Sequence, residues 1–78
     1  MMEIAIRSEW EKANVMLTDR EFEILKEIAG GYSSKEIGNR LGISLKTVEV
    51  HRHNILRKTR AKNSVHLCLE LARKGLLK

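Results

Sequence analysis

The stretch SSKEIGNRLGISLKTVEVHRHNILRK, residues 33–58, carries the clearest pattern for predicting the fold of this chain. Its opening SSKE has the spacing of a capping box, in which a serine and a glutamate three residues later satisfy the first N–H groups of a helix. Gly42 is typical of a helix end, and Ser44 can cap a second helix after a very short connection. Two helices joined so tightly cross steeply, so the pattern predicts a helix-turn-helix whose second helix spans about residues 45–59.

Gly38 lies inside the shorter of these two helices. Two interpretations are open at this point. The missing side chain either lets the two helices approach closely, or the glycine is simply tolerated at a cost of about 1 kcal/mol relative to alanine.

Helices are also predicted on both sides of this unit. TDRE, residues 18–21, is a second capping box and opens a helix that ends at the glycine pair 30–31. A fourth helix begins near Asn63 or Ser64 and ends at Gly75. With 78 residues, 42% of them hydrophobic and none of them proline, we expect an all-α fold, a compact four-helix domain.

We place this domain at residues 17–78 and treat residues 1–16 as an N-terminal arm. The arm is either a remnant of a linker or a short helix around Trp10. Two apolar stripes run along the fourth helix. We assign one to the core, namely Val65, Leu69, Ala72 and Leu76. The other needs separate cover, from a partner subunit or from the arm with Ile4, Ile6 and Trp10, and consists of Ser64, Leu67 and Leu71.

Positive charge is concentrated in one part of the chain. The net charge is +5, and residues 44–63 hold six lysines and arginines against a single carboxylate, Glu49. A basic stripe on one helix is typical of a surface that binds a polyanion, and a solvated charged face is the plain alternative. Because the major groove of double-stranded DNA admits one helix, the pattern predicts that the helix at 45–59 reads DNA there.

Other classes of protein are disfavoured. The single cysteine, Cys68, cannot form an internal disulfide or a Cys-rich zinc site. His51 and His53 lie about 200° apart around a helix and cannot chelate one ion, so we expect no metal and no cofactor. No catalytic constellation has a recognisable spacing, so no enzyme is predicted. Without a long apolar run or a signal peptide, we expect no membrane association and a cytoplasmic location.

The run LTDREFEILKEIAGGYSSKEIGNRLGISLKTVEVHRHNILRK, the pair Lys62 and Asn63 and the closing KGLL resemble the LuxR/GerE-type helix-turn-helix domain, the output domain of many bacterial response regulators of the FixJ and NarL type. TVEVHR is similar to the FixJ branch, and the length is similar to that of small stand-alone members such as GerE. The resemblance covers residues 17–77. It implies a DNA-binding transcription regulator that forms dimers through its fourth helix, where Ser64, Leu67 and Leu71 lie.

The resemblance also implies roles for individual residues. The base-reading positions fall on Glu49, Val50 and His53. The phosphate-contacting positions fall on Ser34, Lys35, Lys46, Thr47, His51 and Lys58. To these we add Arg52 and Arg57 from the helical wheel and their charge. The chain departs from many relatives at Glu49, where they carry lysine, and at Thr59, where most carry leucine.

Two of these residues have competing interpretations. Glu49 either accepts a hydrogen bond from a cytosine amine or pairs with Arg52 or His53, and we favour the pairing. His51 is either a half-buried packing residue or a phosphate contact.

The expected partners are double-stranded DNA, a second copy in a weak homodimer that DNA strengthens, and RNA polymerase as a further candidate. Two alternative functions stay open. One is a promoter-binding module similar to region 4 of a sigma factor, which would need the polymerase to bind. The other is a helical adaptor for an acidic protein, which would have no affinity for duplex DNA.

Overall fold

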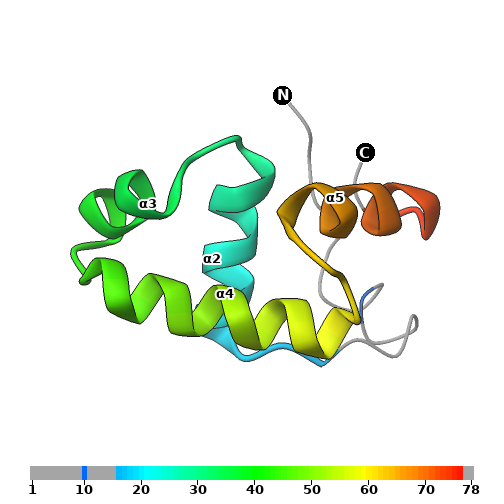
Figure 1. The fold of residues 1–78 in the computed structure, drawn as a ribbon, viewed down its shortest axis with the longest axis horizontal. Helices are drawn as coiled ribbons and strands as arrows, with labels where there is room; N and C mark the ends of the chain where they lie inside the picture. Colours follow the sequence, from blue (N-terminus) through cyan, green and yellow to red (C-terminus); the bar gives the residue numbers. More distant parts are fainter. Residues whose placement is uncertain (1–9, 11–15, 77–78) are drawn as a thin grey trace.

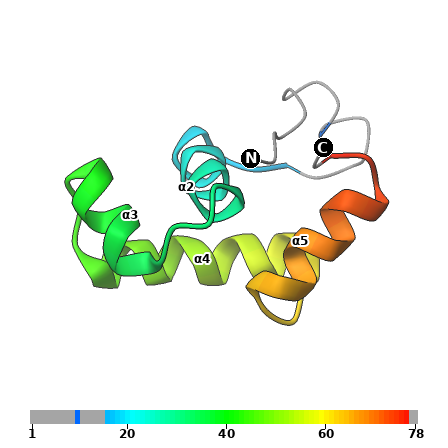
Figure 2. The same cartoon turned by 90° about the horizontal axis from the view of Figure 1, so that it is seen from above.

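The computed structural model describes Trp10 and residues 16–76. This part of the chain contains the helices α2 (Asp19–Ala29), α3 (Ser34–Leu41), α4 (Leu45–Thr59) and α5 (Ser64–Arg73) and no strand, which confirms the predicted all-α fold (Figure 1). Figure 2 shows α4 along one side of the molecule, with α2 next to it and α3 and α5 toward opposite ends. The helix-turn-helix is formed by α3 and α4.

Side-chain caps begin these helices. Thr18 Oγ1 accepts a hydrogen bond from the Glu21 N–H at 3.1 Å, and Glu21 Oε1 accepts one from the Thr18 N–H at 2.9 Å. Ser33 and Glu36 form the same reciprocal pair at the start of α3. Ser44 caps α4 through its side-chain oxygen. Both predicted capping boxes are therefore confirmed.

The turn between α3 and α4 requires two glycines for different reasons. Gly42 has a φ of 70°, in the left-handed region that side chains disfavour. Gly38 has an ordinary φ, but a Cβ placed on it would lie 2.8 Å from the carbonyl oxygen of Ile43. The Ile43 N–H donates to the Gly38 carbonyl oxygen at 3.0 Å, which holds the two residues together. The close-approach interpretation of Gly38 is confirmed.

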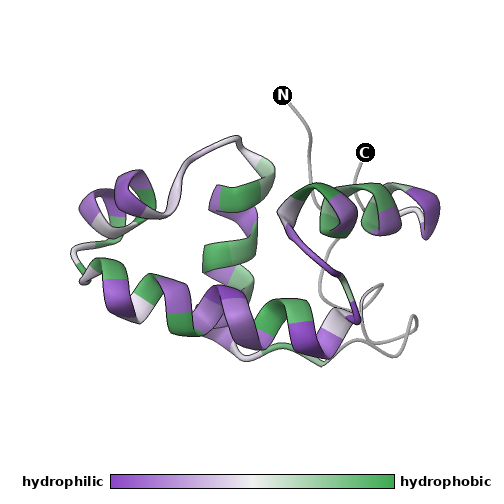
Figure 3. Cartoon of the chain, in the orientation of Figure 1, coloured by the Kyte–Doolittle hydropathy of each residue, from purple (hydrophilic) through white to green (hydrophobic). Residues whose placement is uncertain are grey.

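The core is formed by residues from all four helices, α2, α3, α4 and α5. Figure 3 shows hydrophobic and hydrophilic segments alternating along α4, as expected for a helix with one buried face. Trp10 is buried in the same cluster and packs edge-on against Phe22, with 5.8 Å between ring centroids. The other buried hydrophobic residues are Leu17, Ile24, Leu25, Ile28, Ile37, Val48, Ile55, Leu67, Leu71 and Leu76.

The prediction of which α5 stripe faces the core was wrong, because the other stripe is the buried one. Leu67 and Leu71 are 0% and 2% exposed, whereas Val65 and Leu69 are 72% and 64% exposed. Of the stripe predicted for the core, Leu76 alone is buried. The physical reason is that both stripes are apolar, so the packing against α2 and α4 decides which one turns inward. Trp10 shares the core cluster with Leu67 and Leu71, as cover by the arm requires, while Ile4 and Ile6 lie outside the described residues.

Candidate nucleic-acid interface

The exposed face of α4 carries a row of side chains opposite the core. Val48 and Ile55 are both 0% exposed and mark the buried face of the helix. Residues spaced at i, i+4, i+7 and i+11 form one stripe along a helix. On the outer side of α4 that stripe, called here the reading stripe, consists of the exposed residues Lys46, Val50, His53 and Arg57.

Glu49 is exposed on α4 one turn before His53. Among the described residues, its carboxylate takes part in no hydrogen bond or ion pair. The favoured pairing with Arg52 or His53 is therefore absent. An unengaged carboxylate beside the reading stripe has its full capacity to accept hydrogen bonds.

The first turns of α3 and α4 supply further polar groups. Lys35 and Lys46 are exposed, and Ser34 is half-buried. The Thr47 hydroxyl lies 2.8 Å from the Ser44 hydroxyl, so these two side chains hold each other at the α4 cap. The N-terminal turn of a helix carries a partial positive charge, which favours anionic groups such as phosphates.

Arg52 and Lys58, which are two of the predicted phosphate contacts, have partners inside the domain. The Arg52 guanidinium donates to the Ser64 hydroxyl at the start of α5. The Lys58 ammonium lies 2.6 Å from Glu21 Oε1 in the first turn of α2. Ser64, for which the family resemblance implied a place in a dimer interface, accepts this hydrogen bond from Arg52.

His51 is half-buried on α4. Its Nδ1 atom is buried and has no hydrogen-bond partner among the described residues. This arrangement fits the packing interpretation for that edge of the ring. It leaves Nε2 as the atom that a phosphate contact would use.

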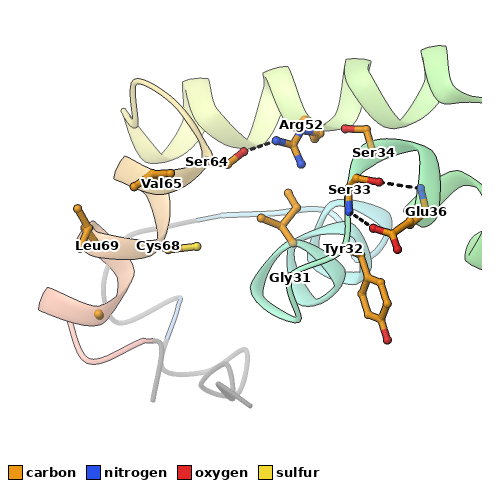
Figure 4. Close-up of a pocket in the computed structure, with 12 residues that line it drawn as sticks. Gly31, Tyr32, Ser33, Ser34, Glu36, Arg52, Ser64, Val65, Cys68 and Leu69 are labelled. Carbon is orange, nitrogen blue, oxygen red and sulfur yellow. Dashed lines mark hydrogen bonds between the residues drawn. The ribbon is translucent and has the colours of Figure 1, made fainter.

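An open groove of about 660 Å³ separates α5 from the end of α2 and the start of α3 (Figure 4). Arg52 projects from α4 between the two walls and points to Ser64. The α5 wall carries Val65 and Leu69, and its lining is largely apolar. The exposed apolar surface of α5 is thus continuous with this groove.

Among the described residues, Glu21 in the first turn of α2 is the one charged residue that is buried. It is 3% exposed. Burial by itself would raise the pKa of the Glu21 carboxyl, but hydrogen bonds from Lys58 and from the Thr18 N–H outweigh burial and hold this pKa below its ordinary value of 4.5. The carboxylate is therefore the form that the fold stabilises.

Arg40 connects α3 of the helix-turn-helix to the end of α2. Its Nε donates to Glu27 Oε2 at 3.0 Å, and its guanidinium stacks over the Tyr32 ring at 4.0 Å from the centroid. These contacts fix α3 against the end of α2, so that α3 holds α4 at a set angle.

The candidate residues taken from the sequence left out two exposed cations beyond α4. Arg60 ends α4 with a φ of 59°, and Lys62 follows in the connection to α5. The high net charge of residues 44–63, to which both contribute, could have identified them in the sequence. They add two exposed positive charges in the segment that follows the reading stripe.

No group of three His, Cys, Asp or Glu side chains that could hold a metal ion occurs in the described part of the chain. Over the same residues, no helix combines the length and the apolar character needed to cross a membrane.

Comparison with known proteins identifies relatives. Residues 15–71 match the family described as bacterial regulatory proteins, luxR family. The chain is 47% identical over 60 residues to the uncharacterized response regulatory protein YgeK of Escherichia coli K12, covering 77% of this chain and 41% of that protein. It is 44% identical over 62 residues to the oxygen regulatory protein NreC of Staphylococcus carnosus, covering 80% and 29%.

The chain thus spans less than half the length of these curated relatives. Among solved structures it has no significant match. The family match takes in α2, α3 and α4 completely and most of α5, including the helix-turn-helix and its basic outer face. The chain therefore belongs to the luxR family of bacterial regulatory proteins.

Proposed function

We propose that this chain binds double-stranded DNA in a sequence-specific way and regulates transcription, with α4 in the major groove. The observation that carries the proposal is the reading stripe, which stands exposed on the face of α4 opposite Val48 and Ile55. Its basic ends suit phosphates, and its less polar middle suits base edges. Membership in a family of regulators supports a binding role over an enzymatic one.

The residues divide by the chemistry they offer. Val50, which is 53% exposed, can contact a thymine methyl group, and His53 can hydrogen-bond to a base edge. Glu49 can accept a hydrogen bond from a cytosine amine, because it has no engagement among the described residues. Phosphate contacts would come from the first turns of α3 and α4 and from the outer end of α4, namely Ser34, Lys35, Lys46, Thr47 and Arg57.

Dimerisation through α5 remains part of the proposal, with different residues. Leu67 and Leu71 are core residues and cannot meet a partner without unfolding the domain. Val65 and Leu69 lie one turn apart and expose large apolar side chains on one face of α5. A two-fold axis at this face would make a small contact that is weak in free solution and that binding to two adjacent half-sites would strengthen.

The family and the relatives support the proposed cellular location and partner of this function. YgeK is named a response regulatory protein and NreC an oxygen regulatory protein. A regulator of this kind acts on DNA in the bacterial cytoplasm, with RNA polymerase as the machinery it influences.

Selection of bound sequences from a random duplex pool, followed by titrations at several salt concentrations, tests the function. Cations at phosphates release counterions, so the slope of log affinity against log salt should be about −4 to −7 per bound pair of domains. Lys46→Ala should weaken binding to all duplexes about equally, whereas His53→Ala should change the preferred bases.

The matched control is Lys26→Ala, which removes an exposed cation from α2, next to α4, and should leave binding unchanged. A slope near zero for the wild-type chain would exclude DNA as the ligand.

A further inference from the structure

Lys58 and Glu21 form a contact between the last turn of α4 and the first turn of α2. Lys58 Nζ lies 2.6 Å from Glu21 Oε1, and the two residues are 37 positions apart in the chain. The Glu21 side chain is 5% exposed and the Lys58 side chain 33% exposed. The ammonium group is thus drawn toward the domain interior and away from the surface that the reading stripe occupies.

The same carboxylate oxygen has a second donor. Glu21 Oε1 also accepts the Thr18 N–H at 2.9 Å, as part of the capping box that begins α2. If Lys58 turned outward to a phosphate, a buried carboxylate would lose its cationic partner. An uncompensated buried charge is strongly unfavourable, so this contact opposes the movement of Lys58 to DNA.

The contact also acts on the orientation of α4. Lys58 follows the buried Ile55 by one turn, and the next residue, Thr59, is 7% exposed with its hydroxyl donating to the Ile55 carbonyl oxygen at 2.8 Å. Apolar packing at Val48 and Ile55 allows small rotations of a helix about its axis, whereas a short charged hydrogen bond fixes a distance and a direction. A rotation of α4 would move every residue of the reading stripe.

We propose that the Glu21–Lys58 pair positions the recognition helix, and that Lys58 serves DNA binding through this contact instead of through a phosphate. The inference rests on the proposed DNA-binding function. It makes Glu21, a residue of α2 on the opposite side of α4 from the reading stripe, a determinant of DNA specificity.

Glu21→Gln distinguishes a positioning role of Lys58 from a phosphate-binding role, because the two roles predict opposite changes in DNA affinity. Glutamine keeps the shape and an acceptor oxygen but removes the negative charge. If Lys58 were a phosphate ligand held back by Glu21, the substitution would free it and DNA would bind more tightly. For a positioning pair, affinity for the selected duplex should fall by about tenfold, while affinity for a mixed-sequence duplex stays nearly unchanged.

Lys58→Met gives a second, independent arm, with Arg57→Met as its matched control. Arg57 is the neighbouring cation on α4 and is exposed. Arg57→Met should reduce the magnitude of the salt slope by about 0.9 for each domain. Lys58→Met should leave the slope unchanged and still lose affinity for the selected duplex, as Glu21→Gln does.

Affinities are measured by fluorescence anisotropy on the full chain, at a temperature where circular dichroism shows each variant to be folded. A purely structural role would change thermal stability but not the preference of the folded protein for its selected duplex. Tighter binding by Glu21→Gln, or a slope change in Lys58→Met equal to that in Arg57→Met, would overturn the proposal. If Glu21→Gln does not fold, the Lys58→Met and Arg57→Met pair decides alone. Absence of DNA binding by the wild-type chain would instead refute the proposed function itself.

Discussion

Single residues of α4 owe their roles to partners that lie far away in the sequence. Arg52 reaches Ser64, and Lys58 reaches Glu21. Arg57 lies in the same basic run but is exposed on the reading stripe. Of these three cations, Arg52 and Lys58 have partners inside the domain, and Arg57 is exposed on the reading stripe together with Lys46.

The pKa of Glu21 leads to a prediction about acid stability. Because burial is outweighed by hydrogen bonds from Lys58 and Thr18, the pKa is lower in the folded than in the unfolded chain. A carboxyl group whose pKa is lowered by folding stabilises the folded state at pH values above its pKa in the unfolded chain. This stabilisation is lost as the pH falls through its pKa in the folded chain. The free energy of unfolding of the wild-type chain should therefore exceed that of Glu21→Gln at pH 7, with the difference shrinking below about pH 4.5.

Urea denaturation followed by circular dichroism between pH 7 and pH 3 measures this difference. Glu23→Gln is the control, because its carboxylate is at the surface and its ion pair with Arg20 spans 3.6 Å. Its effect on stability should be small at every pH. If the difference in free energy of unfolding between the wild-type chain and Glu21→Gln did not change with pH, the lowered pKa of Glu21 would be contradicted.

Among the elements, α3 depends on one glycine for its approach to α4. A Cβ on Gly38 would lie 2.8 Å from a backbone oxygen, and backbone cannot move aside as a flexible side chain can. Gly38→Ala should therefore destabilise the domain by about 1–3 kcal/mol, despite the better helix propensity of alanine.

Thermal or urea unfolding measures the effect, with Asn39→Ala as the control. Asn39 is the next residue of α3 and is exposed, so its replacement should change stability by less than about 0.5 kcal/mol. Equal stability of the Gly38→Ala and wild-type proteins would show that the turn relaxes without cost.

On the scale of the whole molecule, α5 has one apolar face in the core and another in solvent. Leu67 and Leu71 close the core, and Val65 and Leu69 remain exposed beside the groove (Figure 4). If the exposed face joins two copies, Leu69→Glu should abolish cooperative binding to an inverted repeat with half-sites about 10 base pairs apart. Half-site binding and helix content should persist.

Anisotropy titrations on full and half sites, beside circular dichroism, test this assembly. Leu67→Ala is the contrasting variant and should cost about 2–5 kcal/mol of stability, because it leaves a cavity in the core. Unchanged cooperativity of Leu69→Glu would place any dimer contact elsewhere on the molecule.

The helices, their caps, the turn and the family can all be predicted from the sequence, because those signals are local. A capping box spans four residues, and the turn of the helix-turn-helix is short enough to be predicted from Gly42 and Ser44. The outer stripe of α4 was also accessible, since Val48 and Ile55 mark one face and the basic residues the other. These features depend on helical periodicity and on neighbouring residues, which the chain displays directly.

Contacts between the helices, in contrast, determine which α5 stripe is buried and which α4 cations have a partner inside the domain. Both apolar stripes of α5 have helical periodicity, so periodicity cannot tell which one is buried. The surface formed by the other helices determines that Leu67 is buried and Leu69 is exposed. The partners of Arg52 and Lys58 lie 12 and 37 residues away, and no pattern along the chain specifies such contacts. Packing thus contributes to the distribution of charge on this domain, because Lys58 is held at a buried carboxylate while the neighbouring Arg57 is exposed.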